Sequence, residues 1–198
     1  TAELARAVAT ESGHITVHVR PSKRGLGAAY RDAFERVLAE GYDVVVSMDV
    51  DFSHDPAAIP SLLARIEAGA DAVIGSRYVP GGGTVNWPLH RRMLSRWGNR
   101  YTTTILRLPV HDCTTAFRAY RATALAAIEP GTTTADGYAM LTEYTRRVAR
   151  RGFRIDEVPI TFVDRRYGAS KMSGRIVAES MLLVTWWAVR DLFRRGRA

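Results

Sequence analysis

The chain has 198 residues, 46% of them hydrophobic and 24% charged, a composition suited to one globular domain with a sizeable core. Its single cysteine, Cys113, excludes an internal disulfide framework and favours a reducing compartment, and no signal-peptide pattern opens the sequence. The net charge of +8 is localised, because residues 1–145 carry 15 basic and 15 acidic side chains, whereas residues 146–198 carry 13 and 5. Such an excess indicates a polyanionic partner, either nucleic acid or an anionic membrane.

Helical and strand-like segments alternate through the first eighty residues. The predicted segments are helices at 1–12, 28–40 and 56–68, the last capped by Asp55, and strands at 15–19, 44–48 and 71–76. A loop at 21–27 with two glycines and two cations precedes the second helix. The order implies right-handed crossovers and a mostly parallel sheet, which places the chain in the α/β class.

The strand at 44–48 ends in two carboxylates, Asp49 and Asp51. Its short, β-branched apolar run predicts a buried parallel strand. Side chains at i and i+2 of an extended chain point to one side, so both carboxylates would project from the strand's carboxyl end, where open α/β sheets bind ligands. Two hard oxygen ligands suit Mg²⁺ or Mn²⁺ carrying substrate phosphates. The alternative is that Asp49 caps a turn and Asp51 is solvated.

The second half begins with residues 77–88, which predict a flexible loop whose three glycines, Gly81 to Gly83, could close over a ligand as a lid. Residues 89–106 predict a helix that carries several arginines: Arg91, Arg92, Arg96 and Arg100. The remaining predictions are a loop running into a strand at 111–120, helices at 121–128 and 137–151, a strand at 155–163 and a basic loop at 164–174. Pro159 interrupts the last strand and favours an edge position.

Residues 175–198 predict a C-terminal helix. Its apolar stretch, 176–189, has fourteen residues, fewer than the roughly twenty that a bilayer span requires. Tryptophans lie beside arginines, as in a helix at the surface of an anionic leaflet; they are Trp186, Trp187, Arg190, Arg194, Arg195 and Arg197. The alternatives are a helix packed on the domain and a helix leading into a membrane span. The predicted domains are therefore 1–174 and an amphipathic interfacial helix at 175–198.

Four stretches together resemble the family-2 glycosyltransferases, and within them the dolichol/polyprenol-phosphate mannose synthases. They are VVVSMDVDFSHDP, GSRYVPGGGTVNWPLHRRMLSRWGN, DCTTAFRAY and ITFVDRRYGASKMS. The resemblance runs nearly end to end and implies a GT-A-like three-layer sandwich. The opening TAELARAVA is similar to the segment after the family's acidic turn, so the family's first strand and that turn, which grip the donor's base and ribose, are expected to be missing. Ser53 stands where some members have Gln, a metal ligand, and Ala116 where Gly is usual.

The resemblance implies inverting transfer of mannose from GDP-mannose to a polyprenyl phosphate, with a β-linked product. It implies a site for Mg²⁺ or Mn²⁺ at Asp49, Asp51 and Ser53, and donor or sugar binding at Asp49, Asp51, Asp112 and His54. The acceptor phosphate is expected at Arg77, Arg92, Ser95, Arg165 and Lys171, and the residues expected to carry catalysis are Asp49, Asp51 and Arg77. A phosphate monoester has a second pKa of about 6 and is already dianionic near neutral pH, so it requires no strong general base.

Some roles stay open at the level of sequence. His54 either orients the diphosphate or metal shell or caps the following helix, Glu143 is a further candidate for the site, and Arg118 flanks the loop near the sugar. The enzyme is expected to be peripheral at the cytoplasmic face of an anionic membrane, with a membrane protein as a further candidate partner. Rival functions are hexosyl transfer from a UDP-sugar and a catalytically silent membrane-docking protein. Nucleic-acid binding is disfavoured, because the sequence has no helix-turn-helix, no zinc-ligand spacing and no aromatic–basic interleaving.

Overall fold

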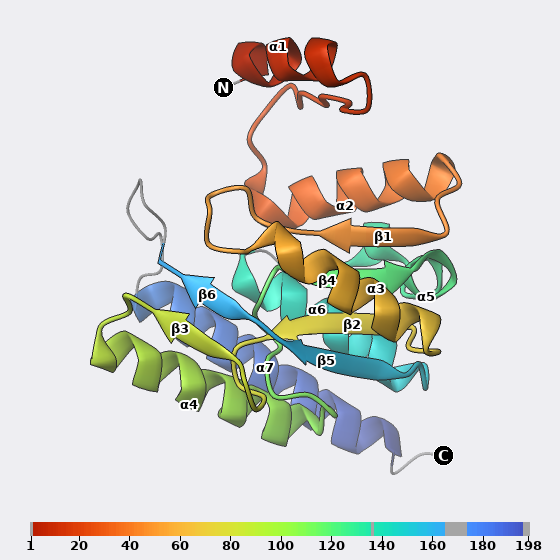
Figure 1. Ribbon diagram of the computed structural model, residues 1–198. Helices are drawn as coiled ribbons and strands as arrows, with labels where there is room; N and C mark the ends of the chain where they lie inside the picture. Colours follow the sequence, from red (N-terminus) through yellow and green to blue (C-terminus); the bar gives the residue numbers. More distant parts are fainter. Residues whose placement is uncertain (1, 136, 165–173, 196–198) are drawn as a thin grey trace.

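The computed structural model describes residues 2–135, 137–164 and 174–195. Figure 1 shows a twisted sheet with helices on both faces, and α1 (Ala2–Ser12), which buries none of its residues, set apart at one end. The larger helices of the body are α2 (Gly25–Ala39), α3 (Ile59–Glu67), α4 (Leu89–Leu106), α6 (Tyr138–Arg150) and α7 (Gly174–Arg195). Shorter ones are α5 (Ala122–Ala127) and the 3₁₀ turns η1 (Pro56–Ala58) and η2 (Pro130–Thr132).

The main sheet has the strand order β1-β4-β2-β5. Its strands are β1 (Val44–Ser47), β4 (Arg118–Arg121), β2 (Ala72–Ser76) and β5 (Ile155–Pro159). β4 is antiparallel to both β1 and β2, and β2 is parallel to β5, so three strands share one direction and β4 opposes them. A second, two-stranded parallel sheet pairs β3 (Gly83–Val85) with β6 (Thr161–Val163). The α/β prediction of a mostly parallel sheet is confirmed.

The sheet separates two apolar layers, as alternation along its strands requires. Val73 and Ala119 face one another across β2 and β4 and join the cluster that contains Leu62 and Ile66 of α3. Their sequence neighbours Ala72 and Tyr120 point to the other side and join a larger cluster of side chains from α2, α5, α6 and α7. Helices on both faces give the three layers that the resemblance implied.

Two predictions about the first strands are wrong. Residues 15–19 form no strand, and Ile15 and Val19 are about half exposed, at 47% and 48%. β1 is not a buried parallel strand, because it pairs with antiparallel β4 and buries only Val45. A strand needs a partner for its backbone groups, and within the described residues β4 is the one strand that pairs with β1.

The glycine-rich segment at 77–88 is more ordered than the predicted flexible lid. Gly83 begins β3, and its backbone N–H donates to the carbonyl of Ile160 at 3.0 Å. A Cβ on Gly82 would lie 2.5 Å from the carbonyl oxygen of Ser76, so the backbone passes directly over the end of β2 where only glycine fits. The segment is therefore packed against the sheets.

Most other element predictions are confirmed. α4 has the predicted bounds, α6 buries Met140, Leu141, Tyr144 and Val148, and β5 lies at an edge of the four-stranded sheet. Asp55 caps the turn that precedes α3, since its carboxylate accepts from the backbone N–H of Ala57 at 2.9 Å. Among the described helices, none combines the length and apolar character needed to cross a bilayer.

Candidate active site

The turn after β1 carries the two predicted metal ligands in different settings. Asp49 is exposed and lines a pocket that extends to α4 and α7, whereas Asp51 is half-buried and does not line it. Asp51 accepts from the Ser53 backbone N–H at 3.1 Å and also from the Ser53 hydroxyl. This contact is an Asx turn, and it fixes the Asp51 side chain over a backbone in which Phe52 has a φ of 64°. The predicted donors Asp49, Asp51 and Ser53 thus lie on one short turn.

The buried side chain of His54 stabilises this turn. It is 4% exposed, and its Nδ1 accepts from the backbone N–H of Asp49 at 3.3 Å. Its ring contacts those of Phe117 and Phe162, each at 5.2 Å between centroids. Burial lowers the pKa of His54 to about 4, so the ring is neutral and supports the turn without charge. The helix cap is Asp55, which excludes the capping role considered for His54.

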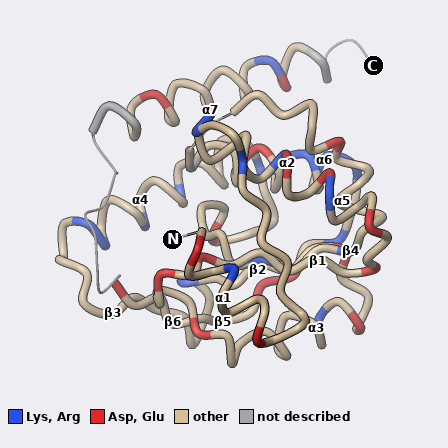
Figure 2. Tube along the Cα trace, turned by 90° about the horizontal axis from the view of Figure 1, so that it is seen from above, with Lys and Arg blue, Asp and Glu red and all other residues tan. Residues whose placement is uncertain are grey.

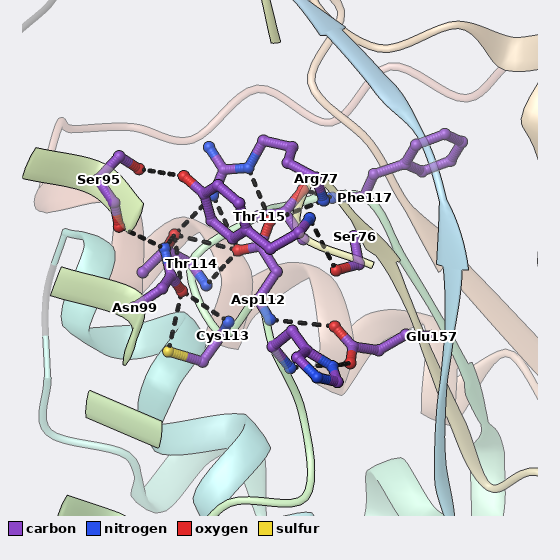
Figure 3. Close-up of polar contacts among 12 residues, drawn as sticks. Ser76, Arg77, Ser95, Asn99, Asp112, Cys113, Thr114, Thr115, Phe117 and Glu157 are labelled. Carbon is purple, nitrogen blue, oxygen red and sulfur yellow. Dashed lines mark hydrogen bonds and ion pairs between the residues drawn. The ribbon is translucent and has the colours of Figure 1, made fainter. Parts of the chain in front are cut away.

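Arg77 and Asp112 form a buried ion pair at the end of β2. Arg77 Nε and Nη2 donate to the two carboxylate oxygens of Asp112 at 2.7 and 2.8 Å, and Nη2 also donates to Thr114 at 2.7 Å (Figure 3). The side chains are 6% and 0% exposed. Burial alone would raise the pKa of Asp112, but the Arg77 charge and its hydrogen bonds lower it below its usual value. The resemblance assigned Arg77 to the acceptor phosphate and Asp112 to the donor sugar, whereas in the structure the two residues form one ion pair.

A hydrogen-bonded network holds the loop that carries Asp112. Glu157 of β5 accepts from the backbone N–H groups of His111 and Asp112, at 2.8 and 3.0 Å. On the other side Asn99 of α4 accepts from the Cys113 backbone at 2.9 Å and donates to Thr114 at 3.0 Å (Figure 3). The fully buried Arg118 donates to the carbonyls of Cys113 and Thr115, each at 2.7 Å. Arg118 therefore fixes the shape of this loop.

A pocket connects the turn after β1 with the space between α4 and α7. Its lining includes two aromatic residues, Trp87 and Phe162, and these polar ones: Asp49, Arg77, Arg91, Ser95, Asn99, Thr114 and Thr115. Its apolar walls include Leu94, Leu141, Val177, Met181 and Val184. One cavity thus brings an acidic group, two arginines and an aliphatic surface together.

Arg91 and Trp87 are pocket residues that sequence reasoning did not select for the site. The Arg91 guanidinium lies 4.1 Å from the centroid of the Trp87 ring, and its Nη1 donates to both carboxylate oxygens of Asp164 at 3.0 and 2.9 Å. The predicted Arg92 is exposed and lies outside the pocket lining. Trp87 precedes Pro88, the N-cap of α4, so helical spacing offered no signal that links it to Arg91.

Of the other predicted residues, one lines the pocket, one does not, and two lie outside the described residues. Ser95 lines the pocket, and its hydroxyl accepts from the Tyr78 hydroxyl at 2.7 Å. Arg165 and Lys171 lie outside the described residues. Glu143 is absent from the pocket lining; it accepts from the backbone of Thr134 and Ala135 and pairs with Arg147.

Comparison with known proteins finds one matching family and similar relatives, two of which are described here. The family model described as glycosyl transferase family 2 matches residues 1–128. A polyprenol monophosphomannose synthase of Mycolicibacterium smegmatis is 45% identical over 183 residues, covering 91% of this chain and 69% of that protein. An undecaprenyl-phosphate mannosyltransferase of Micrococcus luteus is 47% identical over 198 residues, covering 100% of this chain and 81% of the relative.

Two solved structures share the fold. Glucosyl-3-phosphoglycerate synthase from Mycobacterium tuberculosis, in complex with Mn²⁺ and UDP-glucose, gives a TM-score of 0.51 at 19% identity over 86% of this chain and 55% of that one. The same enzyme with phosphoglyceric acid gives 0.53 at 22% identity, over 91% and 64% respectively. The chain thus spans between half and two thirds of these structures, whose likeness supports the GT-A-like fold alone. The family match and the identity to both relatives together establish that the chain is a glycosyltransferase of family 2.

Proposed function

We propose that this glycosyltransferase transfers mannose from GDP-mannose to a polyprenyl phosphate, with inversion, to give a β-linked polyprenyl-phosphate mannose. The names and the 45% and 47% identities of the two relatives support this substrate class. The structural observation that carries the proposal is the pocket itself, which has Asp49 and two arginines at its polar part and aliphatic walls between α4 and α7. That combination suits a lipid phosphate and a nucleotide sugar.

The turn after β1 suits a divalent cation at the donor side. Asp49 and Asp51 offer carboxylate oxygens on one turn, the hard donors that Mg²⁺ and Mn²⁺ prefer, whereas the predicted Ser53 is buried and its hydroxyl donates to Asp51. Among the described residues no cluster of three or more His, Cys, Asp or Glu side chains surrounds a cation site, so the remaining ligands would come from the donor diphosphate. When bound, such an ion neutralises the charge that develops on the departing nucleotide. His54 keeps the turn in place through the Asp49 backbone.

The arginines suit the acceptor phosphate, which is a dianionic nucleophile near neutral pH. Nη1 of Arg77, and Nε and Nη2 of Arg91, make no hydrogen bond to any described residue, so these N–H groups are available to phosphate oxygens. Ser95 adds a hydroxyl in the same pocket. Arg92, Arg165 and Lys171 remain candidates by resemblance alone. These cations would hold the phosphate in line with the sugar.

The surface beside the pocket suits a membrane that delivers the lipid. Exposed apolar side chains lie at helical spacing on α4 (Leu89, Met93, Trp97) and on α7 (Leu182, Trp186, Val189, Phe193). Arginines accompany them: Arg92, Arg96 and Arg100 are exposed on α4, where Figure 2 shows several basic positions, and Arg190 lies 4.7 Å from the Trp186 ring. Apolar side chains beside arginines favour peripheral docking on an anionic leaflet, which we assign to the cytoplasmic face.

The direct test supplies labelled GDP-mannose or UDP-glucose with a polyprenyl phosphate and a divalent cation. We expect label in the lipid product with GDP-mannose only, loss of transfer with a chelator, and a β-linked product. Transfer from UDP-glucose would favour the hexosyltransferase alternative. A retained anomeric configuration would contradict direct attack by the acceptor phosphate.

A further inference from the structure

We propose that Trp87 is a positioning residue that fixes Arg77 and Arg91 as a pair of phosphate-binding groups. The inference rests on the proposed function, in which the bound anion is the phosphate of a polyprenyl phosphate. It adds to that function the group that sets the relative placement of the two cations. Trp87 lies in the connection between β3 and α4, four residues before Arg91.

One indole ring contacts both guanidinium groups. The ring centroid of Trp87 lies 4.1 Å from the guanidinium carbon of Arg91 and 5.6 Å from that of Arg77. Both distances fall within the range in which a cation is attracted to an aromatic ring. Two like charges in one pocket repel each other, and a shared ring offsets part of this repulsion while it holds both groups at a set spacing.

Each arginine also has a carboxylate that uses only part of its donors. Asp112 occupies Nε and Nη2 of Arg77, and Asp164 occupies Nη1 of Arg91. The guanidinium groups thus keep their remaining N–H donors in fixed orientations. Asp164 and the Trp87 ring hold Arg91. Asp112 and Thr114 hold Arg77, over which the Tyr78, Phe162 and Trp87 rings lie at 5.2, 5.5 and 5.6 Å. Preorganised donors bind an anion without the ordering entropy that a mobile arginine would lose.

The Trp87 ring is itself anchored to the donor side of the pocket. It contacts Phe162 of β6 edge to face, at 5.4 Å and 74°, and Phe162 contacts His54 at 5.2 Å. His54 in turn accepts from the Asp49 backbone. Trp87 thus contacts the arginines directly but reaches the turn that carries Asp49 only through Phe162 and His54. Loss of the indole should therefore disturb acceptor binding more than donor binding.

The test compares Trp87→Leu, which removes the aromatic face, with Trp87→Phe, which keeps a smaller one. We expect Trp87→Leu to raise the KM for polyprenyl phosphate on the order of tenfold, and Trp87→Phe to raise it by about two- to threefold. The KM for GDP-mannose should change less than about twofold in both variants. Tyr42→Leu is the matched control, because Tyr42 is an exposed aromatic residue (57%) outside the pocket lining.

An unchanged acceptor KM in Trp87→Leu, or equal rises in both KM values, would overturn the inference. If Trp87→Leu does not fold, Trp87→Phe decides by the same comparison of the two KM values. If the wild-type protein transfers no mannose, the proposed function fails, and titration with inorganic phosphate tests Trp87 alone. Weaker phosphate binding in the variant than in the wild type would then support the inference, and equal binding would refute it.

Discussion

At the scale of single residues, the pocket depends on charges that are already paired inside the protein. Arg77 and Asp112 are almost completely shielded from water and make a bidentate contact. Taking two charges from water is unfavourable, so such a pair contributes little net stability but is very sensitive to loss of one partner. Its role is to place one arginine rigidly beside the pocket.

Asp112→Asn should therefore destabilise the protein by about 3–5 kcal/mol, because Arg77 would keep a buried charge without a counter-ion. Chemical denaturation monitored by circular dichroism measures this change. The control is Asp156→Asn, which breaks an exposed pair with Arg154 and should change the free energy of unfolding by less than about 1 kcal/mol. Equal losses in the two variants would contradict the buried-pair argument.

Cys113 gives a second residue-scale prediction. The thiol is fully buried, and burial together with the nearby Asp112 charge raises its pKa to about 12. Only the thiolate reacts readily, so the native protein at pH 8 should resist a disulfide-forming thiol reagent and react fully in urea. Because the unfolded thiol ionises near 9.0 and the folded one near 12, Cys113 should also lower stability as pH rises through that interval. Rapid labelling of the native protein would refute this.

At the scale of elements, α7 presents two different faces. Val184 and Trp187 are buried against the body, and Asp191 pairs with Arg146 and Arg150 of α6. Trp186 and Phe193 are exposed, at 54% and 74%. Sequence reasoning treated the adjacent tryptophans as equivalent, but neighbouring helical residues point about 100° apart. Packing on the domain and contact with a membrane, which were alternatives at the level of sequence, are compatible in this helix.

This division predicts opposite effects for the two tryptophans. Trp187→Ala should reduce the free energy of unfolding by about 3–5 kcal/mol, because it leaves a cavity in the core. Trp186→Ala should change stability by less than about 1 kcal/mol but reduce recovery with anionic liposomes in flotation. Tyr42→Ala, which alters an exposed aromatic residue elsewhere, should float as the wild type does. Unchanged flotation of Trp186→Ala would remove the membrane role of this face.

The elements could be predicted from the sequence wherever local pattern decides. The helix predicted at 89–106 has the bounds of α4, and Asp55-Pro56 marked the cap before α3. Strand partners could not be predicted, because pairing is a long-range choice: antiparallel β4 lies between β1 and β2, although it follows them in sequence. In the site, Asp49 could be found because it follows a strand, whereas the Arg77–Asp112 pair joins residues that are 35 positions apart.

At the scale of the whole molecule, the residues proposed to serve the donor and those proposed to meet the lipid lie on different elements around one pocket. Asp49 belongs to the turn after β1, whereas Val177, Met181 and Val184 belong to α7. The α4 and α7 helices lie side by side (Figure 1). A substitution in the turn should therefore leave the surface proposed to meet the membrane unchanged.

Asp51→Asn should lower mannosyl transfer by about a hundredfold or more and weaken Mn²⁺ binding in calorimetry, because one charged oxygen donor is lost. Flotation with liposomes should stay unchanged. Asp55→Asn is the matched control, since it removes the same charge four residues later and Asn is an equally good cap. Full transfer by Asp51→Asn would exclude the proposed metal site, and loss of flotation would show that the two parts are not separate.

The stretch from Ile155 to Asp164 belongs to both sheets: β5 ends at Pro159, and β6 resumes at Thr161. Along this single run lie Glu157, which holds the Asp112 loop, Phe162, which contacts both His54 and Trp87, and Asp164, which pairs with Arg91. Inserting one residue near Pro159 would turn the later side chains to the opposite face. Phe162 would then leave the pocket and Asp164 would leave Arg91, so this segment should tolerate changes of side chain far better than changes of length.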